Sequence, residues 1–125
     1  MSTILVVDDD FAILEGLSLL LEGEGFRVRK ASDGAEGLAR LAEEAADLVV
    51  SDVMMPVMTG PAMVARMAAE PRLAKIPVIL LTATIGMKRP VHPQVLAVLP
   101  KPFLLDQLLA AIHRALAESG ARNNR

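Results

Sequence analysis

Short runs of apolar residues alternate along this chain with longer stretches in which apolar residues recur every three or four positions. The short runs predict five β-strands, and the longer stretches predict helices. The strands are placed at residues 3–7, 27–30, 48–51, 77–81 and 95–99. Strands that alternate with helices are typical of a parallel sheet covered on both faces, so we expect an α/β fold with a doubly wound sheet.

The polarity of each run predicts its place in the sheet. Three runs, in the first, third and fourth strands, are apolar almost throughout, as expected of central strands with neither face in water. The run at 27–30 carries three basic residues and is predicted to form an edge strand. Pro100 follows the fifth run directly, and because proline has no N–H for a ladder, that strand is predicted at the other edge.

Four regular helices are predicted, over residues 11–23, from Asp33 onward, from Gly60 to before Pro71, and over 104–119. A shortened or irregular helix is expected between the last two of them. Asp33 and Glu36 have the spacing of a capping box, in which each side chain accepts a hydrogen bond from a free N–H. The expected buried positions of the second helix are Leu38, Leu41 and Ala45.

The first and last helices have one apolar face each. In the first, Ile13, Leu14, Leu17, Leu20 and Leu21 share that face, and Glu15, Ser18 and Glu22 lie opposite. In the last, the apolar stripe is Leu105, Leu108, Leu109, Ile112 and Leu116.

One segment interrupts the alternation. Pro90 and Pro93 lie between the fourth and fifth strands and leave room for about one turn of helix, so a shortened or irregular fourth helix is expected over 84–94. The polar residues 120–125 are expected to form a frayed tail after a single domain at 1–119.

Composition narrows the function classes. With 125 residues, 53% of them hydrophobic and 22% charged, the chain suits one packed domain and not a disordered segment. A net charge of -2, together with the absence of Trp and Tyr, argues against a surface that binds nucleic acid directly. The absence of cysteine excludes disulfides, thiolate metal sites and thiol nucleophiles.

The amino-terminal residues do not resemble a secretion signal. The start MSTILVVDDD has no basic region, and three aspartates end its apolar run. No apolar run approaches the roughly 18 residues that a membrane helix needs. We expect a soluble, cytoplasmic protein without a membrane partner.

Acidic residues follow two of the predicted central strands. Asp8 and Asp9 come directly after the first strand, and Asp52 ends the third. In a doubly wound sheet, ligands bind outside the carboxyl ends of the strands where the winding reverses, so these three carboxylates should meet. Because like charges resist joint ionisation, the cluster favours a hard cation among its oxygens, Mg²⁺ or alternatively Mn²⁺.

Other polar residues near these strand ends differ in their expected roles. Asp10 precedes the first helix and is better explained as its N-cap. Thr82 closes the fourth strand, and Lys101 follows the fifth between two prolines. A hydroxyl and an ammonium added to carboxylates and a divalent ion would suit a phosphoryl group, whose oxygens need donors and positive charge.

Four runs, ILVVDDD, LVVSDVMMPVMTG, VILLTA and PKPF, together resemble the CheY-like receiver domain of bacterial two-component response regulators. The resemblance implies a flavodoxin-like five-stranded sheet in the order 2-1-3-4-5. It implies that Asp52 accepts a phosphoryl group, and that Asp9 binds Mg²⁺ directly while Asp8 acts through water. It further implies that the backbone carbonyl of Met54 binds the metal, that Thr82 and Lys101 bind phosphoryl oxygens, and that the bond from Lys101 to Pro102 is cis.

The same resemblance implies the partners. A phosphohistidine of a sensor histidine kinase or of a histidine phosphotransfer protein would supply the phosphoryl group. The chain would be a phosphoacceptor and not a turnover enzyme, a monomer or weak dimer without direct contact to nucleic acid. The alternatives are a receiver-like interaction module that is never phosphorylated, a flavodoxin-type redox carrier and a small Mg²⁺-dependent phosphatase.

One position departs from the pattern of this family. Receivers commonly carry Tyr or Phe three residues before the lysine, where this chain has Val98. We expect phosphorylation to be reported by a surface other than the usual one, or to cause a small structural change.

Overall fold

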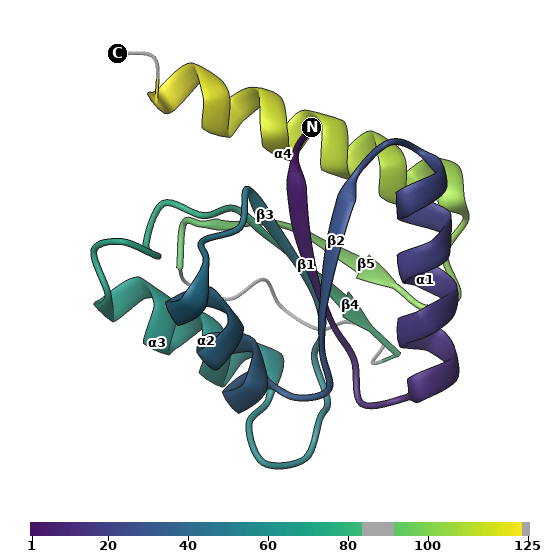
Figure 1. Ribbon diagram of the computed structural model, residues 1–125, viewed down its shortest axis with the longest axis horizontal. Coiled ribbons are helices and arrows are strands. Elements are labelled where there is room, and N and C mark those ends of the chain that lie inside the picture. The colour runs from purple at the N-terminus through teal and green to yellow at the C-terminus, as the bar shows by residue number, and fades with distance from the viewer. Residues whose placement is uncertain (84–91, 124–125) are drawn as a thin grey trace.

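The computed structural model describes residues 1–83 and 92–123, in which strands and helices alternate as the hydrophobic pattern predicts (Figure 1). The strands are β1 (Thr3–Val7), β2 (Arg27–Ala31), β3 (Leu48–Asp52), β4 (Val78–Thr82) and β5 (Val95–Pro100). The helices are α1 (Phe11–Gly23), α2 (Gly34–Glu43), α3 (Gly60–Ala69) and α4 (Leu105–Asn123). The prediction of a shortened or irregular fourth helix at 84–94 falls on a segment that is largely outside the described residues.

The five strands form one parallel sheet in the order β2-β1-β3-β4-β5, which confirms the predicted fold class. The two strands expected at the edges, β2 and β5, lie there. Helices α1 and α4 cover one face of the sheet, and α2 and α3 cover the other (Figure 1). The chain therefore winds in both directions from β1, and the winding reverses between β1 and β3.

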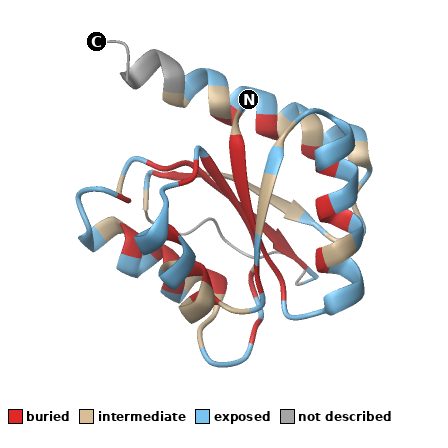
Figure 2. Ribbon diagram, viewed as in Figure 1, coloured by how far each residue is buried: buried red, intermediate tan, exposed pale blue. Residues whose placement is uncertain are grey.

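Each face of the sheet has its own hydrophobic core, because successive side chains of a strand point to opposite faces. In β1, Leu5 and Val7 pack with residues of α2 and α3, whereas Ile4 and Val6 pack with residues of α1 and α4. Both sets are buried, and the central strands are buried along their length (Figure 2). Burial on both faces explains why these strands are continuous apolar runs in the sequence.

Two predictions about helix faces are wrong. Ser18 was expected opposite the apolar face of α1 but is buried, with 2% of its surface exposed, whereas Ile13 and Leu20, expected on that face, are 39% and 51% exposed. The serine hydroxyl donates to the carbonyl oxygen of Leu14 at 2.7 Å, so the helix can turn this residue toward the core without leaving a polar group unpaired. Ala45 was expected to be buried but is exposed, because α2 ends at Glu43 and the chain turns before Ala46 enters the core.

The cap predicted for α1 is confirmed, and the capping box predicted for α2 forms in part: the Glu36 carboxylate accepts from the hydroxyl of Ser32 at 2.8 Å and not from a backbone N–H. Asp10 accepts hydrogen bonds from the backbone N–H groups of Ala12 and Ile13 at 3.0 and 3.2 Å. Asp33 accepts from the N–H of Glu36 at 2.8 Å. These caps fix where α1 and α2 begin, and with them the length of the loops that follow β1 and β2. The last helix, α4, continues past the predicted end at residue 119.

The edge strand β2 is lined with ion pairs. Its basic side chains reach glutamates on both faces of the sheet: Lys30 pairs with Glu15 of α1, Arg29 with Glu43 at the end of α2, and Arg27 with Glu44 directly after α2. The pairs place charge along a border of the sheet whose backbone groups on one side have no strand beside them. In the described part of the chain, no helix is long and apolar enough to cross a membrane.

Candidate functional site

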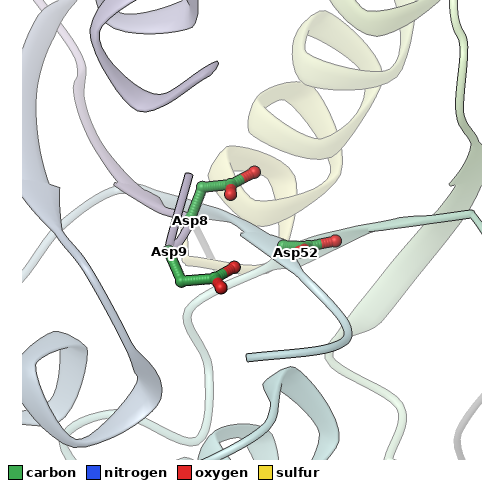
Figure 3. Close-up of side chains that lie close together, drawn as sticks. All are labelled: Asp8, Asp9 and Asp52. Carbon is green, nitrogen blue, oxygen red and sulfur yellow. The ribbon is translucent and has the colours of Figure 1, made fainter. Parts of the chain in front are cut away.

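Three carboxylates meet at the carboxyl edge of the sheet. Asp8 and Asp9 follow β1, and Asp52 is the last residue of β3, so the pairing of these two strands brings them together. Each can offer one oxygen such that the three oxygens lie within 4.8 Å of one another. Figure 3 shows the three side chains beside one another at the ends of β1 and β3. The sequence predicted this cluster, and it lies where the winding of the sheet reverses.

Lys101 joins two of these carboxylates. Its Nζ lies 3.1 Å from Oδ1 of Asp52 and 3.4 Å from Oδ2 of Asp8. Its backbone N–H donates to the carbonyl oxygen of Thr82 at 2.7 Å, which ties the segment after β5 to the end of β4. The bond to Pro102 is cis, as the family resemblance implies. A single ammonium thus neutralises part of the charge of a cluster that spans three strands.

Asp8 is the most buried of the three carboxylates, with 3% of its side chain exposed. Burial raises the pKa of Asp8 above its ordinary value, and the charge of Asp52 adds to the increase. The N–H of Asp10 and the ammonium of Lys101 oppose it, because both stabilise the carboxylate. The group is therefore held in an environment that favours protonation unless more positive charge is present.

The surroundings of Lys101 favour its charged form, in contrast to those of Asp8. Burial lowers the pKa of this lysine, but the hydrogen bond to Asp52 and the charge of Asp8 outweigh burial, and the pKa lies above its usual value. The lysine therefore remains a cation throughout the neutral range. A permanent positive charge beside Asp52 can bind an oxygen of an incoming anion.

The side chain of Asp52 is more exposed than that of Asp8, at 13%. Its Oδ1 accepts a hydrogen bond from the N–H of Val53 at 3.0 Å. After this residue the chain turns sharply, and the N–H of Gly60 returns to the carbonyl oxygen of Val53 at 2.9 Å. A Cβ at Gly60 would lie 2.5 Å from the backbone oxygen of Asp52, so only glycine fits this close approach. The glycine fixes the start of α3 directly behind Asp52.

The other candidate residues lie around this cluster. Thr82 ends β4 and is 3% exposed. Met54 lies in the loop after β3, and its side chain is 66% exposed. Asp10 uses its carboxylate to cap α1, so the sequence-based separation of Asp10 from its two acidic neighbours is confirmed. Val98 is partly buried on the α2 and α3 side of β5.

The loop between β3 and α3 contains a feature that the sequence did not reveal. Val57 has a φ of 68°, a backbone conformation that β-branched residues rarely adopt. The N–H of Met58 donates to the carbonyl oxygen of Pro56 at 2.7 Å, which closes a three-residue γ-turn around Val57. Pro56 indicates a turn in this loop, but nothing in the sequence indicates that Val57 adopts a strained backbone conformation there.

The donors of this site suit a hard divalent cation. Three carboxylates within reach of one another supply only oxygen, and oxygen ligands of high negative charge suit Mg²⁺ better than a soft metal. A cation would also stabilise the charged form of Asp8, whose pKa is raised mainly by burial and further by the charge of Asp52. The residues present therefore fit a bound magnesium ion.

Comparison with known families agrees with the resemblance that the sequence motifs indicate. The family described as the response regulator receiver domain matches residues 4–113 of this chain. The chain belongs to that family. The matched residues include all of the sheet except Thr3, and every candidate site residue named above.

The relatives of this receiver domain include regulators of transcription. It is 37% identical to a protein of Haemophilus influenzae named transcriptional regulatory protein CpxR homolog, in an alignment that covers 99% of this chain and 54% of that protein. The receiver domain thus spans about half the length of the curated relatives that it matches.

Solved receiver structures share its fold. A CheY-like receiver domain protein from Methanospirillum hungatei has a TM-score of 0.86 at 29% identity, with 98% of both chains covered. The response regulator TrrA from Thermotoga maritima, solved in complex with Mg²⁺ and BeF, has a TM-score of 0.82 at 28% identity, with 92% of this chain and 99% of that chain covered.

Proposed function

We propose that Asp52 accepts a phosphoryl group from the phosphohistidine of a sensor histidine kinase or a histidine phosphotransfer protein. The observation that carries the proposal is the bridge from Lys101 to Asp52 and Asp8, beside the oxygens of Asp9. This arrangement pairs a partly exposed carboxylate with a fixed cation and with two further metal-ligating groups. Phosphoryl transfer needs little more than such positioning and neutralisation of charge.

The acidic residues would hold the metal. Asp9 and Asp52 would bind Mg²⁺ directly, Asp8 through water, and the backbone carbonyl of Met54 would complete the ligands from the chain, with Mn²⁺ as the alternative ion. When bound, the ion supplies positive charge that offsets the negative charge developing on the transferred group. Support for this ion comes from the all-oxygen donor set and from TrrA, which was solved with Mg²⁺ and BeF.

The reaction is a single transfer. A carboxylate oxygen of Asp52 attacks phosphorus in line with the leaving group and forms a new O–P bond. The P–N bond to the imidazole breaks, and its electron pair returns to the nitrogen, which takes up a proton from water. The ammonium of Lys101 and the hydroxyl of Thr82 bind the phosphoryl oxygens. The chain leaves the reaction modified, so it acts as a phosphoacceptor and not as a turnover enzyme on an external substrate.

Membership of the family supports a proposal for the partner and for the cellular location. Receiver domains act with sensor kinases, and we propose that this one does so in the cytoplasm as a monomer or weak dimer. Its curated relatives are longer, and some are named as transcriptional regulators. With a net charge of -2 and no Trp or Tyr, this domain is proposed to make no direct contact with nucleic acid.

Labelling by acetyl phosphate tests the proposal. Intact mass spectrometry should show a gain of one phosphoryl group that requires Mg²⁺ and disappears in Asp52→Asn. Asp10→Asn is the matched control, because it removes a nearby carboxylate that only caps α1, and it should retain the gain. An Asp52→Asn protein that is still labelled, or a parent protein that is not labelled although it binds Mg²⁺, would contradict the assignment.

A further inference from the structure

A cavity lies at the edge of the sheet opposite to the acidic cluster. It has a volume of about 470 Å³ and is formed by the segments that precede β1, β3 and β4 and by the far part of α4. The residues that line it include Asp47, Arg72, Lys75, Ile76, Pro77 and Leu116. Because a five-residue strand is roughly 16 Å long, the cavity is well separated from Asp52. Its volume is in the range of small-molecule sites.

The cations of this cavity are not neutralised by the chain. Arg72 and Lys75 both lie in the loop between α3 and β4, and both are exposed. Among the residues that the structure describes, neither forms an ion pair, whereas the arginines of β2 are all paired with glutamates. Two unpaired donors at one wall of a cavity can bind a carboxylate or phosphate group.

The loop that carries these cations is fixed from inside. Gln94 is buried, with 4% of its surface exposed, and its side-chain amide donates to the carbonyl oxygens of Leu73 and Ile76 at 3.1 and 2.9 Å. The N–H of Ile76 also donates to the carbonyl oxygen of Leu73 at 3.1 Å. This loop is therefore held in one shape before any ligand arrives, which lowers the entropy cost of binding.

The cavity also contains a hydrogen-bond acceptor, Asp47. Asp47 and Thr3 exchange two hydrogen bonds: the N–H of Thr3 donates to Oδ2 of Asp47 at 2.7 Å, and the N–H of Asp47 donates to the carbonyl oxygen of Thr3 at 2.8 Å. Within the described part of the chain, Oδ1 of Asp47 has no donor. The apolar side chains of Ile76, Pro77 and Leu116 line the same cavity.

We propose that this cavity binds a small organic anion, independently of phosphorylation at Asp52. Its carboxylate or phosphate group would bind Arg72 and Lys75, its apolar body would rest on Ile76 and Leu116, and a hydroxyl or amino group would donate to Asp47. The required combination is an anionic end, an apolar or ring-shaped middle and a hydrogen-bond donor. Inorganic phosphate has no apolar or ring-shaped middle.

Adenosine monophosphate is a suitable probe, because it combines the three features and cannot phosphorylate Asp52 as acetyl phosphate does. Titration of the ¹⁵N-labelled protein at constant ionic strength should give saturable amide shifts at 46–47 and 72–76. Adenosine and inorganic phosphate should each bind at least about tenfold more weakly, since each lacks one set of contacts.

Matched variants separate this site from general charge attraction. Arg72→Gln combined with Lys75→Gln should weaken binding of adenosine monophosphate by roughly tenfold or more. Arg66→Gln removes an exposed cation of α3 outside the cavity and should leave binding unchanged. All the replaced side chains are exposed, so the amide spectra should remain those of a folded protein.

Three results would overturn the proposal. The first is the absence of saturable shifts at the cavity with millimolar adenosine monophosphate. The second is equal affinity in the parent and the double variant, or for inorganic phosphate alone. The third is a set of shifts confined to Asp8, Asp52 and Lys101, which would place the anion at the proposed phosphorylation site. Acetyl phosphate labelling is a separate measurement, so either site can fail without the other.

Discussion

Val57 carries the clearest backbone strain among the described residues. Its φ of 68° is accessible to glycine without cost, but a β-branched side chain in that region costs of order 1–3 kcal/mol. The residue is 83% exposed, so its side chain contributes little packing energy in return. Strain of this kind persists only where the surrounding structure requires it, and here the γ-turn lies in the loop directly after Asp52.

Relief of this strain can be measured. Val57→Gly should raise the free energy of unfolding by about 1 kcal/mol, because the gain from removed strain exceeds the greater entropy of glycine in the unfolded chain. Chemical denaturation measures the change. Met54→Gly in the same loop is the control, since Met54 is exposed and has no positive φ, and it should be neutral or destabilising. Equal destabilisation by both glycines would show that position 57 is not strained.

The raised pKa of Asp8 predicts how stability depends on pH without metal. An acid whose pKa is higher in the folded chain releases its proton first in the unfolded chain, so the free energy of unfolding falls as pH rises. For Asp8 this loss begins near the ordinary value of 3.8 and continues through the raised pKa of the folded state. At neutral pH the ionised carboxylate is therefore a net cost to the metal-free protein.

Asp8→Asn should remove that cost. In the presence of a chelator, the variant should be more stable than the parent at pH 7 by on the order of 1 kcal/mol, and the difference should vanish at acidic pH. Thermal melting over a pH series measures both. Asp9→Asn loses the same charge from an exposed neighbour and should change stability less. A variant that is less stable than the parent at pH 7 would contradict the reasoning.

At the scale of elements, two glycines have opposite roles. Gly60 begins α3 against the backbone of Asp52, whereas Gly16 lies within α1 with nothing within 4 Å of where a Cβ would be. A new methyl group can be accommodated at Gly16 but would collide with backbone at Gly60. Replacement by alanine should therefore have opposite effects on stability at Gly16, where space is open, and at Gly60, where the backbone of Asp52 is in contact.

Gly16→Ala should stabilise the protein by about 0.5–1 kcal/mol, because alanine loses less conformational entropy in a helix. Gly60→Ala should destabilise it by roughly 1–3 kcal/mol, the usual cost of overpacking, because the loop that follows β3 must move. Denaturant titration of the two variants measures this contrast. A stable Gly60→Ala protein with full acetyl phosphate labelling would show that the close approach is not required.

The elements differ in how well the sequence predicts them. Strand positions were predicted to within one residue, because a strand buried on both faces must be apolar for as long as it crosses the core. Helix faces were predicted less well. The burial of Ser18 depends on how α1 turns against its neighbours and on a hydrogen bond to its own helix, which periodicity alone does not contain. Ala45 was misplaced because α2 ends sooner than its apolar pattern.

The candidate site was predictable for a topological reason. Parallel strands end at one edge, so acidic residues directly after β1 and β3 must lie close together once the strand order is known. The γ-turn at Val57 was not predictable, because nothing in the sequence marks this β-branched residue for a positive φ. The cavity beside Asp47 and Lys75 was not predictable either, because it depends on hydrogen bonds between segments distant in sequence. The roles of Asp8, Asp9, Asp52, Met54, Thr82 and Lys101 stay predictions until labelling tests them.

At the scale of the whole molecule, the question is which surface reports phosphorylation. The family commonly places an aromatic residue where this chain has Val98, which is partly buried beside the α2 and α3 core. A small side chain packed in this way has little freedom to change its position. We therefore expect the response to be small, or to lie away from β5 and the last helix.

Addition of beryllofluoride and Mg²⁺ to the ¹⁵N-labelled protein tests this expectation. Amide shift changes should be largest around residues 8–9, 52–60 and 82–83 and small over α4. Asp52→Asn is the control and should show no such changes. Large shifts confined to 84–100 and α4 would contradict the expectation and would indicate the usual reporting surface of the family.

The ion pairs of β2 affect how copies of this domain meet one another. An uncovered strand can recruit an identical strand from another molecule and so begin polymerisation. A duplicate docked beside β2 would set Arg27, Arg29 and Lys30 against like charges, and it would disturb their pairs with glutamates. Fibre growth from this border is therefore opposed by repulsion, most strongly in dilute salt.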